Sequence, residues 1–287
     1  MDVAVVGAGR VGTALAVLLQ RSGHRIVGVS GRGDTQERAA RYLPDVPVEP
    51  AAAIAERAEI VIVGTPDDRI AGVCSDLVAQ GAFRHGQFVA HLSGATGLAA
   101  LAAASGAGAG VLCVHPLQTF PDVDSAIERV PGSGIAVTAQ DDRGYELGER
   151  LARDVGGRPF RLADERKPLY HAAAVFASNY VVTVLRIAEE LFCDAGGEEL
   201  RDVMMPLVRS TVEAFERLGS VRALTGPAVR GDAETIRANL RALAADRPAV
   251  IPAYVALARV AISGAVLSGR LDVAARERVE SVLNEWT

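Results

Sequence analysis

Short apolar runs alternate with longer amphipathic stretches through the first 160 residues of the chain. The apolar runs predict buried strands of the parallel type at residues 3–6, 26–29, 60–63, 88–91, 111–114 and 135–138. The amphipathic stretches predict helices at residues 13–21, 35–42, 51–57, 68–79 and 98–104, followed by a helix at 141–155 and a last strand at 158–162. This alternation is typical of a doubly wound α/β sheet.

The pattern changes after residue 162. Strand signals stop, and apolar residues recur at helical spacing over residues 168–193, 198–218, 233–245, 248–268 and 273–285. We therefore predict two domains, an α/β domain at residues 1–162 and an all-helical domain at residues 163–287.

Three glycines follow the first predicted strand. Gly7, Gly9 and Gly12 form a G-x-G-x-x-G motif, with Arg10 and Val11 inside it, and a predicted helix follows directly. In this setting the motif is a fingerprint of a Rossmann dinucleotide-binding domain, because the glycines allow a tight turn, close approach of a pyrophosphate and close helix packing. The helix N-terminus then offers free N–H groups to the phosphates. A glycine-rich structural turn is the alternative.

The end of the second predicted strand distinguishes NAD from NADP. NAD-binding domains usually carry an acidic residue there, about 20 residues beyond the glycines, which binds the ribose 2′-hydroxyl. This chain has Ser30 and Arg32 instead. A hydroxyl and a guanidinium suit the 2′-phosphate of NADP, and Arg10 would add to them. We therefore expect NADP as the cofactor; the alternative is that Arg32 is simply solvated.

Polar residues also follow three later strands, where loops at the carboxyl ends line the ligand crevice of such a sheet. Thr65 and Pro66 are expected near the nicotinamide ribose. Ser93 and His115 are candidate substrate contacts. The alternative for both is a local hydrogen bond at a strand end, which is the commoner role of such residues.

Lys167 is the only lysine among 30 basic residues. Lysine, unlike arginine, can give up its proton at a working pH. Pro168 favours the first turn of a helix, so Lys167 is expected at or just before a helix N-terminus, with His171 one turn later. Ser178 is expected on the same face and Asn179 at its flank. Such a row suits hydride transfer to a carbonyl, which needs a proton donor and groups that hold the substrate; a structural histidine and a helix–helix hydrogen bond are the alternatives.

The glycine motif together with Lys167-x-x-x-His171 resembles the 6-phosphogluconate dehydrogenase/3-hydroxyacid dehydrogenase superfamily, and ketopantoate reductases share that arrangement. The superfamily carries a Lys-x-x-x-Asn pair on the corresponding helix, with the lysine as acid/base. The resemblance implies that Lys167 is the proton donor, whereas His171 stands where the asparagine would fall.

Three further motifs are similar to those of a bacterial family of Rossmann-like oxidoreductases whose helical domain has no settled function: HPLQTFP at 115–121, HAAAVFASN at 171–179 and TGPAVRGD at 225–232. The resemblance covers nearly the whole chain. His-Pro-Leu is also similar to the His-Pro-Met of prephenate dehydrogenases, and pyrroline-5-carboxylate reductases are more distant relatives. Within the third motif, Arg230 is a candidate clamp for a substrate carboxylate and Asp232 a candidate helix N-cap; a surface turn is the alternative.

Composition and charge argue against several other classes. A net charge of −5 without a basic patch argues against nucleic acid as a partner. Cys74, Cys113 and Cys193 are too dispersed for a disulfide scaffold or a metal site, which fits a reducing cytoplasm. The apolar stretch at residues 172–187 is interrupted by two polar residues and is expected to be too short to cross a membrane.

We therefore expect a cytoplasmic NADPH-dependent oxidoreductase that transfers a hydride to a small oxo acid, with a ketopantoate-like compound as the first substrate to test. An imine or prephenate-type substrate is the alternative among enzymes. A non-catalytic NADP-binding sensor is the alternative outside them. The amphipathic helices of the second domain are expected to form a homodimer.

Overall fold

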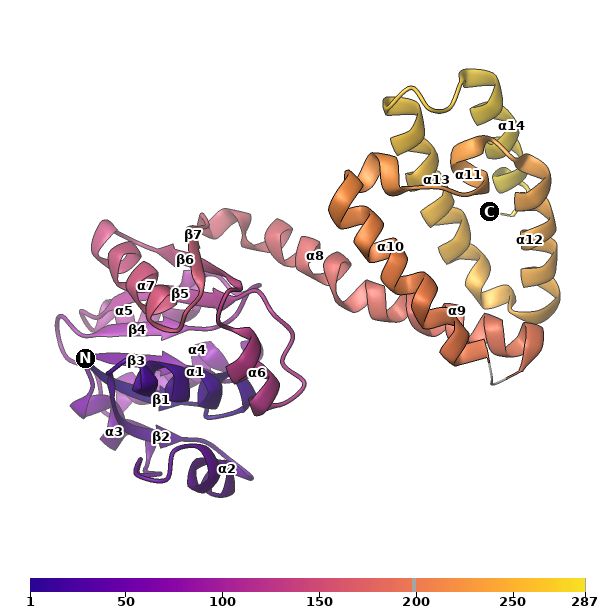
Figure 1. Cartoon of the computed structure of the whole chain (residues 1–287). Coiled ribbons are helices and arrows are strands. Elements are labelled where there is room, and N and C mark those ends of the chain that lie inside the picture. Colours follow the sequence, from indigo (N-terminus) through magenta and orange to yellow (C-terminus); the bar gives the residue numbers. More distant parts are fainter. Residues whose placement is uncertain (198–199, 287) are drawn as a thin grey trace. The chain divides into compact units, whose positions relative to one another are not determined.

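The computed structural model describes residues 1–197 and 200–286 and divides into two compact units, Met1–Asn179 and Tyr180–Thr287. The first unit is built on a seven-stranded sheet with the order β2-β1-β3-β4-β5-β6-β7 (Figure 1). Its strands are β1 (Asp2–Val6), β2 (Arg25–Ser30), β3 (Ile60–Val63), β4 (Phe88–His91), β5 (Gly110–Pro116), β6 (Gly134–Ala139) and β7 (Arg158–Arg161). Every predicted strand is present, and this confirms the α/β class.

The direction of β6 differs from the prediction. β1 to β5 are mutually parallel, so their carboxyl ends share one edge of the sheet. β6 instead pairs antiparallel with β5, with Pro116 opposite Ile135, and β7 runs parallel to β6. A parallel direction for residues 135–138 was therefore wrong. A short buried apolar run has the same composition in either direction, so the run alone could not show the reversal.

Helices cover both faces of this sheet. Successive residues of β1 point to opposite sides, with Val3 and Val5 in one apolar core and Ala4 and Val6 in the other. The first core is covered by α1 (Arg10–Arg21), α2 (Thr35–Tyr42) and α7 (Asp142–Asp154), and the second by α3 (Ala51–Arg57), α4 (Ile70–Ala79) and α5 (Ala102–Gly106). A helix that was not predicted, α6 (Val123–Arg129), packs against α1. These layers hold the carboxyl-end loops of β1 to β5 in place.

The predicted helix at residues 168–193 is wrong in its continuity. The structure has α8 (Lys167–Ala177) and α9 (Asn179–Gly196), separated at Ser178, whose φ of −129° and ψ of −72° are not helical. α8 belongs to the first unit because its first turn packs on the ends of β4 and β5. The division between the units consequently falls after Asn179, later than the predicted boundary at residue 162.

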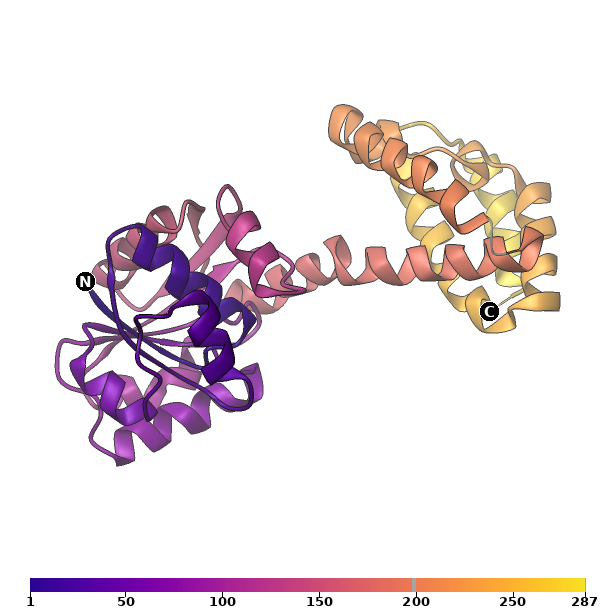
Figure 2. The same ribbon diagram turned by 60° about the horizontal axis from the view of Figure 1, so that its bottom comes forward.

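The second unit consists of helices wherever the structure describes it (Figures 1 and 2). Besides α9, its helices are α10 (Leu200–Ala223), α11 (Pro227–Arg230), α12 (Ala233–Asp246), α13 (Ile251–Leu267) and α14 (Val273–Asn284). α11 to α14 enclose the apolar core around Ile236, Leu240 and Val279. α11 replaces part of a predicted loop. The first two residues of the predicted helix at 198–218 lie outside the described residues.

α9 of the second unit exposes much of its apolar surface. α9 has no buried residue, although Tyr180, Val181, Val182 and Val184 lie along it.

By length and composition alone, the helical stretches Asp164–Gly196 and Pro248–Leu267 are apolar enough to cross a membrane, in contrast to the expectation from the sequence. One or two such helices are weak evidence for a membrane protein.

Candidate functional site

The glycine turn after β1 lies against the turn after β3. Gly7 has a φ of +95°, and a Cβ atom there would lie 2.7 Å from the Thr65 amide nitrogen. A Cβ on Gly12 would lie 2.5 Å from the Gly7 carbonyl oxygen, so α1 packs closely on the turn. At Gly9 nothing lies within 4 Å of that position, which leaves the backbone open to a ligand. This is the geometry that a dinucleotide pyrophosphate requires.

The N-terminus of α1 is free to bind an anion. Its N-cap is Gly9, which has no side chain to accept from the helix amides. Arg10, Val11 and Gly12 form the first turn, where amides have no acceptor within the helix. The helix dipole adds a partial positive charge at the same point. The structure thus brings four of the predicted cofactor-binding residues, Gly9, Arg10, Val11 and Gly12, to the N-terminus of α1.

Thr65 provides an independent sign of a ligand beside this turn. Its side-chain oxygen is buried and has no hydrogen-bond partner. Leaving a buried hydroxyl unpaired costs about 1–3 kcal/mol, so such atoms usually have a partner in the functional state. A Cβ on Gly7 would lie 2.8 Å from Thr65 Cγ2, and Pro66 follows as an exposed residue. The residues present therefore fit a dinucleotide.

The predicted 2′-phosphate residues lie next to the glycine turn. The Ser30 carbonyl accepts hydrogen bonds from the amides of Gly7 (2.7 Å) and Ala8 (2.9 Å), while Arg32 is exposed. A further cation was missed by the sequence analysis: Arg38 of α2 donates from Nη1 to the Ala8 carbonyl at 3.2 Å. Its signal was its position in the first turns of the helix after the second strand, where side chains can face back to the glycines.

Lys167 lies at the first residue of α8, as predicted, and it is completely buried. Its Nζ donates to the Ser93 carbonyl at 2.9 Å and to Cys113 Sγ at 3.1 Å. The Cys113 thiol in turn donates to the same carbonyl at 3.2 Å. Burial raises the pKa of the Cys113 thiol to about 11, so it stays protonated. These bonds fix the amine at the carboxyl ends of β4 and β5.

The Ser93 hydroxyl is engaged locally. Its Oγ donates to Asp67 Oδ2 at 2.7 Å and accepts from the amides of Ala95 (3.2 Å) and Thr96 (2.9 Å). A hydroxyl has one donor and two acceptor positions, so these contacts use all three. Ser93 therefore has the local hydrogen-bonding role that the sequence analysis gave as the alternative. A direct contact between Ser93 and a substrate stays a prediction.

Two histidines at the strand ends are held in their neutral form. Burial, followed by the charge of Lys167, lowers the pKa of His91 to about 3 and that of His115 to about 4. The Ser93 amide donates to His91 Nδ1 at 3.2 Å, which places the proton of His91 on Nε2. Both imidazoles are therefore uncharged at neutral pH, and a cationic lysine lies beside them.

His115 is the more accessible of the two and is tightly fixed. Its Nδ1 and the Tyr170 hydroxyl are hydrogen bonded at 2.9 Å, with the rings edge to face. A Cβ on Gly94 would lie 2.7 Å from the imidazole, so glycine is needed there for the ring to occupy its place. Burial raises the pKa of Tyr170 to about 12. His115 and Tyr170 are partly exposed, whereas Lys167 is not.

The remaining predicted site residues do not all lie in the cluster around Lys167. His171 lies in α8, and its Nδ1 is buried without a hydrogen-bond partner. Ser178 marks the break after α8, so the predicted shared helical face with His171 does not continue through it. Asn179 begins α9 and is exposed. Arg230 ends α11 in the second unit and is exposed, and its substrate role stays a prediction.

Four other members of this cluster were missed by the sequence analysis: His91, Cys113, Tyr170 and Asp67. Three of them had a signal in the sequence, since His91 and Cys113 lie in strands at the crevice and Tyr170 lies three residues after Lys167. Among the described residues, no group of three or more His, Cys, Asp or Glu side chains is arranged to hold a metal ion.

Comparison with known proteins agrees with this architecture. Residues 1–116 match a Rossmann-like domain, and residues 133–261 match a domain of unknown function, DUF2520. The second match includes β6, β7 and α8 as well as much of the helical unit. No curated protein matches the chain.

Solved structures of several oxidoreductases resemble the chain over nearly its full length. A candidate NADP oxidoreductase from Bacteroides fragilis is 26% identical, covers 91% of this chain and 98% of its own, and has a TM-score of 0.74. A Thermotoga maritima protein (20% identity, 97% and 98% coverage, TM-score 0.64) and the NADP-bound pyrroline carboxylate reductase of Plasmodium falciparum (10%, 97% and 98%, 0.60) share the fold. The chain therefore combines a region that matches a Rossmann-like domain with a region that matches DUF2520, and its fold resembles that of solved NAD(P)-binding oxidoreductases.

Proposed function

We propose that this chain is an NADPH-dependent oxidoreductase that reduces the carbonyl of a small oxo acid. The observation that carries the proposal is the orphaned Thr65 hydroxyl beside an open glycine turn, at the same sheet edge as the Lys167 cluster. One edge of the sheet thus provides a place for a dinucleotide and a group that carries a transferable proton. The similarity to the Bacteroides fragilis protein supports the same conclusion.

The cofactor is assigned to the glycine turn and its neighbours. The first-turn amides of α1 would hold the pyrophosphate, and Thr65 would hydrogen bond to the nicotinamide half. Ser30 and Arg32, together with Arg38, would surround the 2′-phosphate, and this is why we prefer NADP to NAD. When bound, the reduced nicotinamide supplies the hydride.

Residues of the chain itself are proposed to donate the proton that carbonyl reduction requires. Lys167 carries a proton that it can release, whereas His91 and His115 are neutral at neutral pH. Its amine is completely buried, so a substrate meets it only after the covering side chains move. The positive charge of Lys167 also stabilises an oxyanion that forms nearby. His171 and Asn179 are proposed to orient the carbonyl.

The substrate is proposed to be a small 2-oxo acid, with ketopantoate as the first compound to test. Arg230 remains the proposed clamp for its carboxylate, because a guanidinium binds a carboxylate through two parallel hydrogen bonds. A cyclic imine or a prephenate-like compound is the alternative substrate. A sensor that binds NADP without turnover is the alternative function.

The test is NADPH oxidation by the purified chain over a panel of 2-oxo acids and cyclic imines. The proposal expects turnover of one compound and a loss of about 100-fold or more in Lys167→Ala, the usual scale of general acid catalysis. Tyr170→Phe is the matched comparison: it removes the hydrogen bond to His115 but leaves the contacts of the Lys167 amine in place, so donation by Lys167 predicts only a small loss. Tight NADPH binding with no turnover on the panel would favour the sensor. Turnover that survives in Lys167→Ala would refute the proton-donor role.

We also propose that the helical unit joins two copies of the chain. α9 lacks buried residues, and α10 exposes Val203, Leu207, Val212 and Phe215 along its length. Apolar surface of this extent is normally covered in a soluble protein. Light scattering after size exclusion is expected to give twice the chain mass, and Phe215→Asp is expected to lower that mass to one chain. A single-chain mass for the unmodified protein would refute this assembly.

A further inference from the structure

A groove opens at the edge of the sheet opposite the glycine turn. Its volume is about 600 Å³, within the range of small-molecule sites. Ile60 and Phe88, at the amino ends of β3 and β4, form part of its lining. Dinucleotides bind at the carboxyl ends of such strands, so this groove is separate from the proposed cofactor site. It lies entirely within the first unit.

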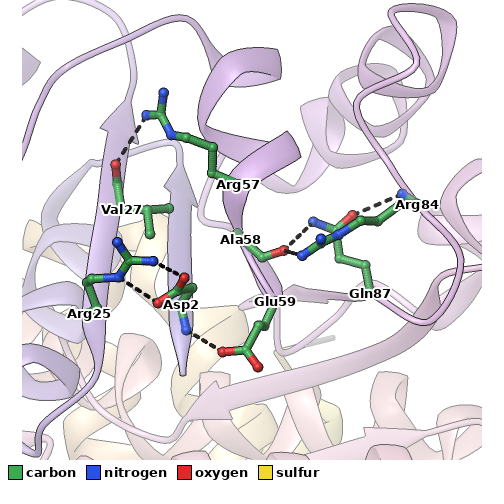
Figure 3. A network of polar contacts seen from close by, with 8 residues as sticks. All are labelled: Asp2, Arg25, Val27, Arg57, Ala58, Glu59, Arg84 and Gln87. Atoms are coloured by element: carbon green, nitrogen blue, oxygen red, sulfur yellow. Dashed lines mark hydrogen bonds and ion pairs between the residues drawn. The ribbon is translucent and has the colours of Figure 1, made fainter.

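One wall of the groove is rigidly built (Figure 3). Gln87 is buried, and its Nε2 donates to the carbonyls of Ala55 (2.6 Å) and Ala58 (2.8 Å). The Arg84 amide donates to Gln87 Oε1, and Arg84 Nη2 donates to the Ala58 carbonyl at 2.7 Å. Glu59 Oε2 accepts from the Asp2 amide at 2.6 Å, which engages this carboxylate of the wall. Hydrogen bonds within the chain therefore hold the side chains of this wall.

The other wall is one face of α7. Residues 143, 146, 147 and 150 share that face, since they are three, four and seven positions apart. Leu147 packs on the sheet core, and the Arg143 guanidinium lies 5.8 Å from the centre of the Phe88 ring. Arg150 completes the face at its far end. Apolar floor and cationic wall thus lie side by side.

The arginines of this wall differ from those elsewhere on the helix. Arg153 pairs with Glu149 at 3.1 Å, and Glu149 also binds Arg161 at 2.7 Å. In the described part of the chain, no carboxylate lies within ion-pair distance of Arg143 or Arg150. A guanidinium that has no carboxylate partner and faces a groove is available to an anion.

We propose that this groove binds an organic anion, namely a phosphate or carboxylate attached to an apolar group. Arg143 and Arg150 take the anionic group from one wall, with Arg84 opposite. The apolar part lies on the partly exposed ring of Phe88, which forms the apolar floor above the buried Ile60. Glu146 belongs to the same lining, and its negative charge opposes an anion placed next to it, so the anionic group is expected beside the guanidinium groups of Arg143 and Arg150.

The experiment is isothermal titration of the full chain, saturated with NADPH, with phenyl phosphate, phenylacetate and inorganic phosphate. Phenyl phosphate is expected to bind more tightly than inorganic phosphate, because only the former covers the apolar floor; phenylacetate distinguishes a carboxylate from a phosphate preference. In the double variant Arg143→Ala/Arg150→Ala the affinity is expected to fall about tenfold or more, whereas the control Arg153→Ala keeps it.

Three results would overturn the proposal: no binding of either aromatic anion at millimolar concentration, equal binding by the double variant, or an equal loss in Arg153→Ala, which would indicate attraction by net charge alone. All three arginines are exposed, so the substitutions leave the core intact. If the chain fails to bind NADPH, the same titration without it still tests the groove, so the two proposals fail separately.

Discussion

Replacing His115 by asparagine is expected to change how the stability of the chain depends on pH. The pKa of His115 is about 4 in the folded chain, whereas an ordinary histidine, as in the unfolded chain, has a pKa of 6.5. Between these two pH values the unfolded chain holds a proton that the folded chain does not. Stability must therefore fall as the pH decreases through this window. Above pH 6.5 the contribution is fully present.

The magnitude follows from the width of the window. A shift of one pKa unit corresponds to about 1.4 kcal/mol, so the lowered pKa of His115 reduces the free energy of unfolding by about 3 kcal/mol when the pH reaches 4. Between pH 6.5 and 5, where most carboxylates stay ionised, the loss amounts to about 1.5 kcal/mol. In His115→Asn this part of the pH dependence disappears. The variant also loses the hydrogen bond to Tyr170, which lowers its stability by the same amount at each pH. This loss does not change the difference in pH dependence between the two proteins.

The assay is urea unfolding of both proteins at several pH values between 6.5 and 5. Far-UV circular dichroism is the suitable probe, because Trp286 lies in the second unit and its fluorescence does not report on the sheet. The free energy of unfolding of the unmodified chain is expected to fall by about 1.5 kcal/mol more than that of the variant. Parallel pH profiles would refute the claim that His115 is held neutral by its surroundings.

Three further substitutions test other parts of the structure. Thr65→Val is expected to leave stability unchanged or raise it by up to about 1 kcal/mol, while weakening NADPH binding several-fold in a fluorescence titration; unchanged binding would exclude Thr65 from the cofactor site. Gly94→Ala is expected to displace the imidazole of His115, seen as a changed ring signal by NMR, because its Cβ would lie 2.7 Å from the ring; an identical spectrum would contradict this. Asp232→Ala is expected to cost about 1 kcal/mol in urea unfolding, since Asp232 caps α12 through the Thr235 amide at 3.1 Å, and no loss would show that the cap is unimportant.

The strands and the glycine turn were predictable because their determinants are local. A buried strand shows itself as a short apolar run, and Gly7, Gly9 and Gly12 follow the first run at fixed spacing. The N-cap at Asp232 was also predicted, and the structure confirms it. The reversal of β6 was not predictable from residues 135–138, since direction depends on how the chain crosses between layers.

The site was only partly predictable because its contacts are long-range. Lys167 was identified because it is the only lysine in the sequence. Its position at the ends of β4 and β5 could not be predicted, because the residues that it contacts lie 54 and 74 positions earlier in the chain. The engagement of the Ser93 hydroxyl depends on Asp67 and on the tight turn that follows it. Arg38 was overlooked because its bond to the Ala8 carbonyl joins residues 30 positions apart, and its position in the helix after the second strand was the only local sign of it.

The measurement that tests the central claim most directly is titration of the purified chain with NADPH and NADH in parallel. The account predicts tight binding of NADPH and much weaker binding of NADH, with the difference reduced in Arg32→Ala and Arg38→Ala because these cations are assigned to the 2′-phosphate. Equal affinity for both nucleotides would contradict the assignment of NADP. Failure to bind either one would contradict the oxidoreductase function itself.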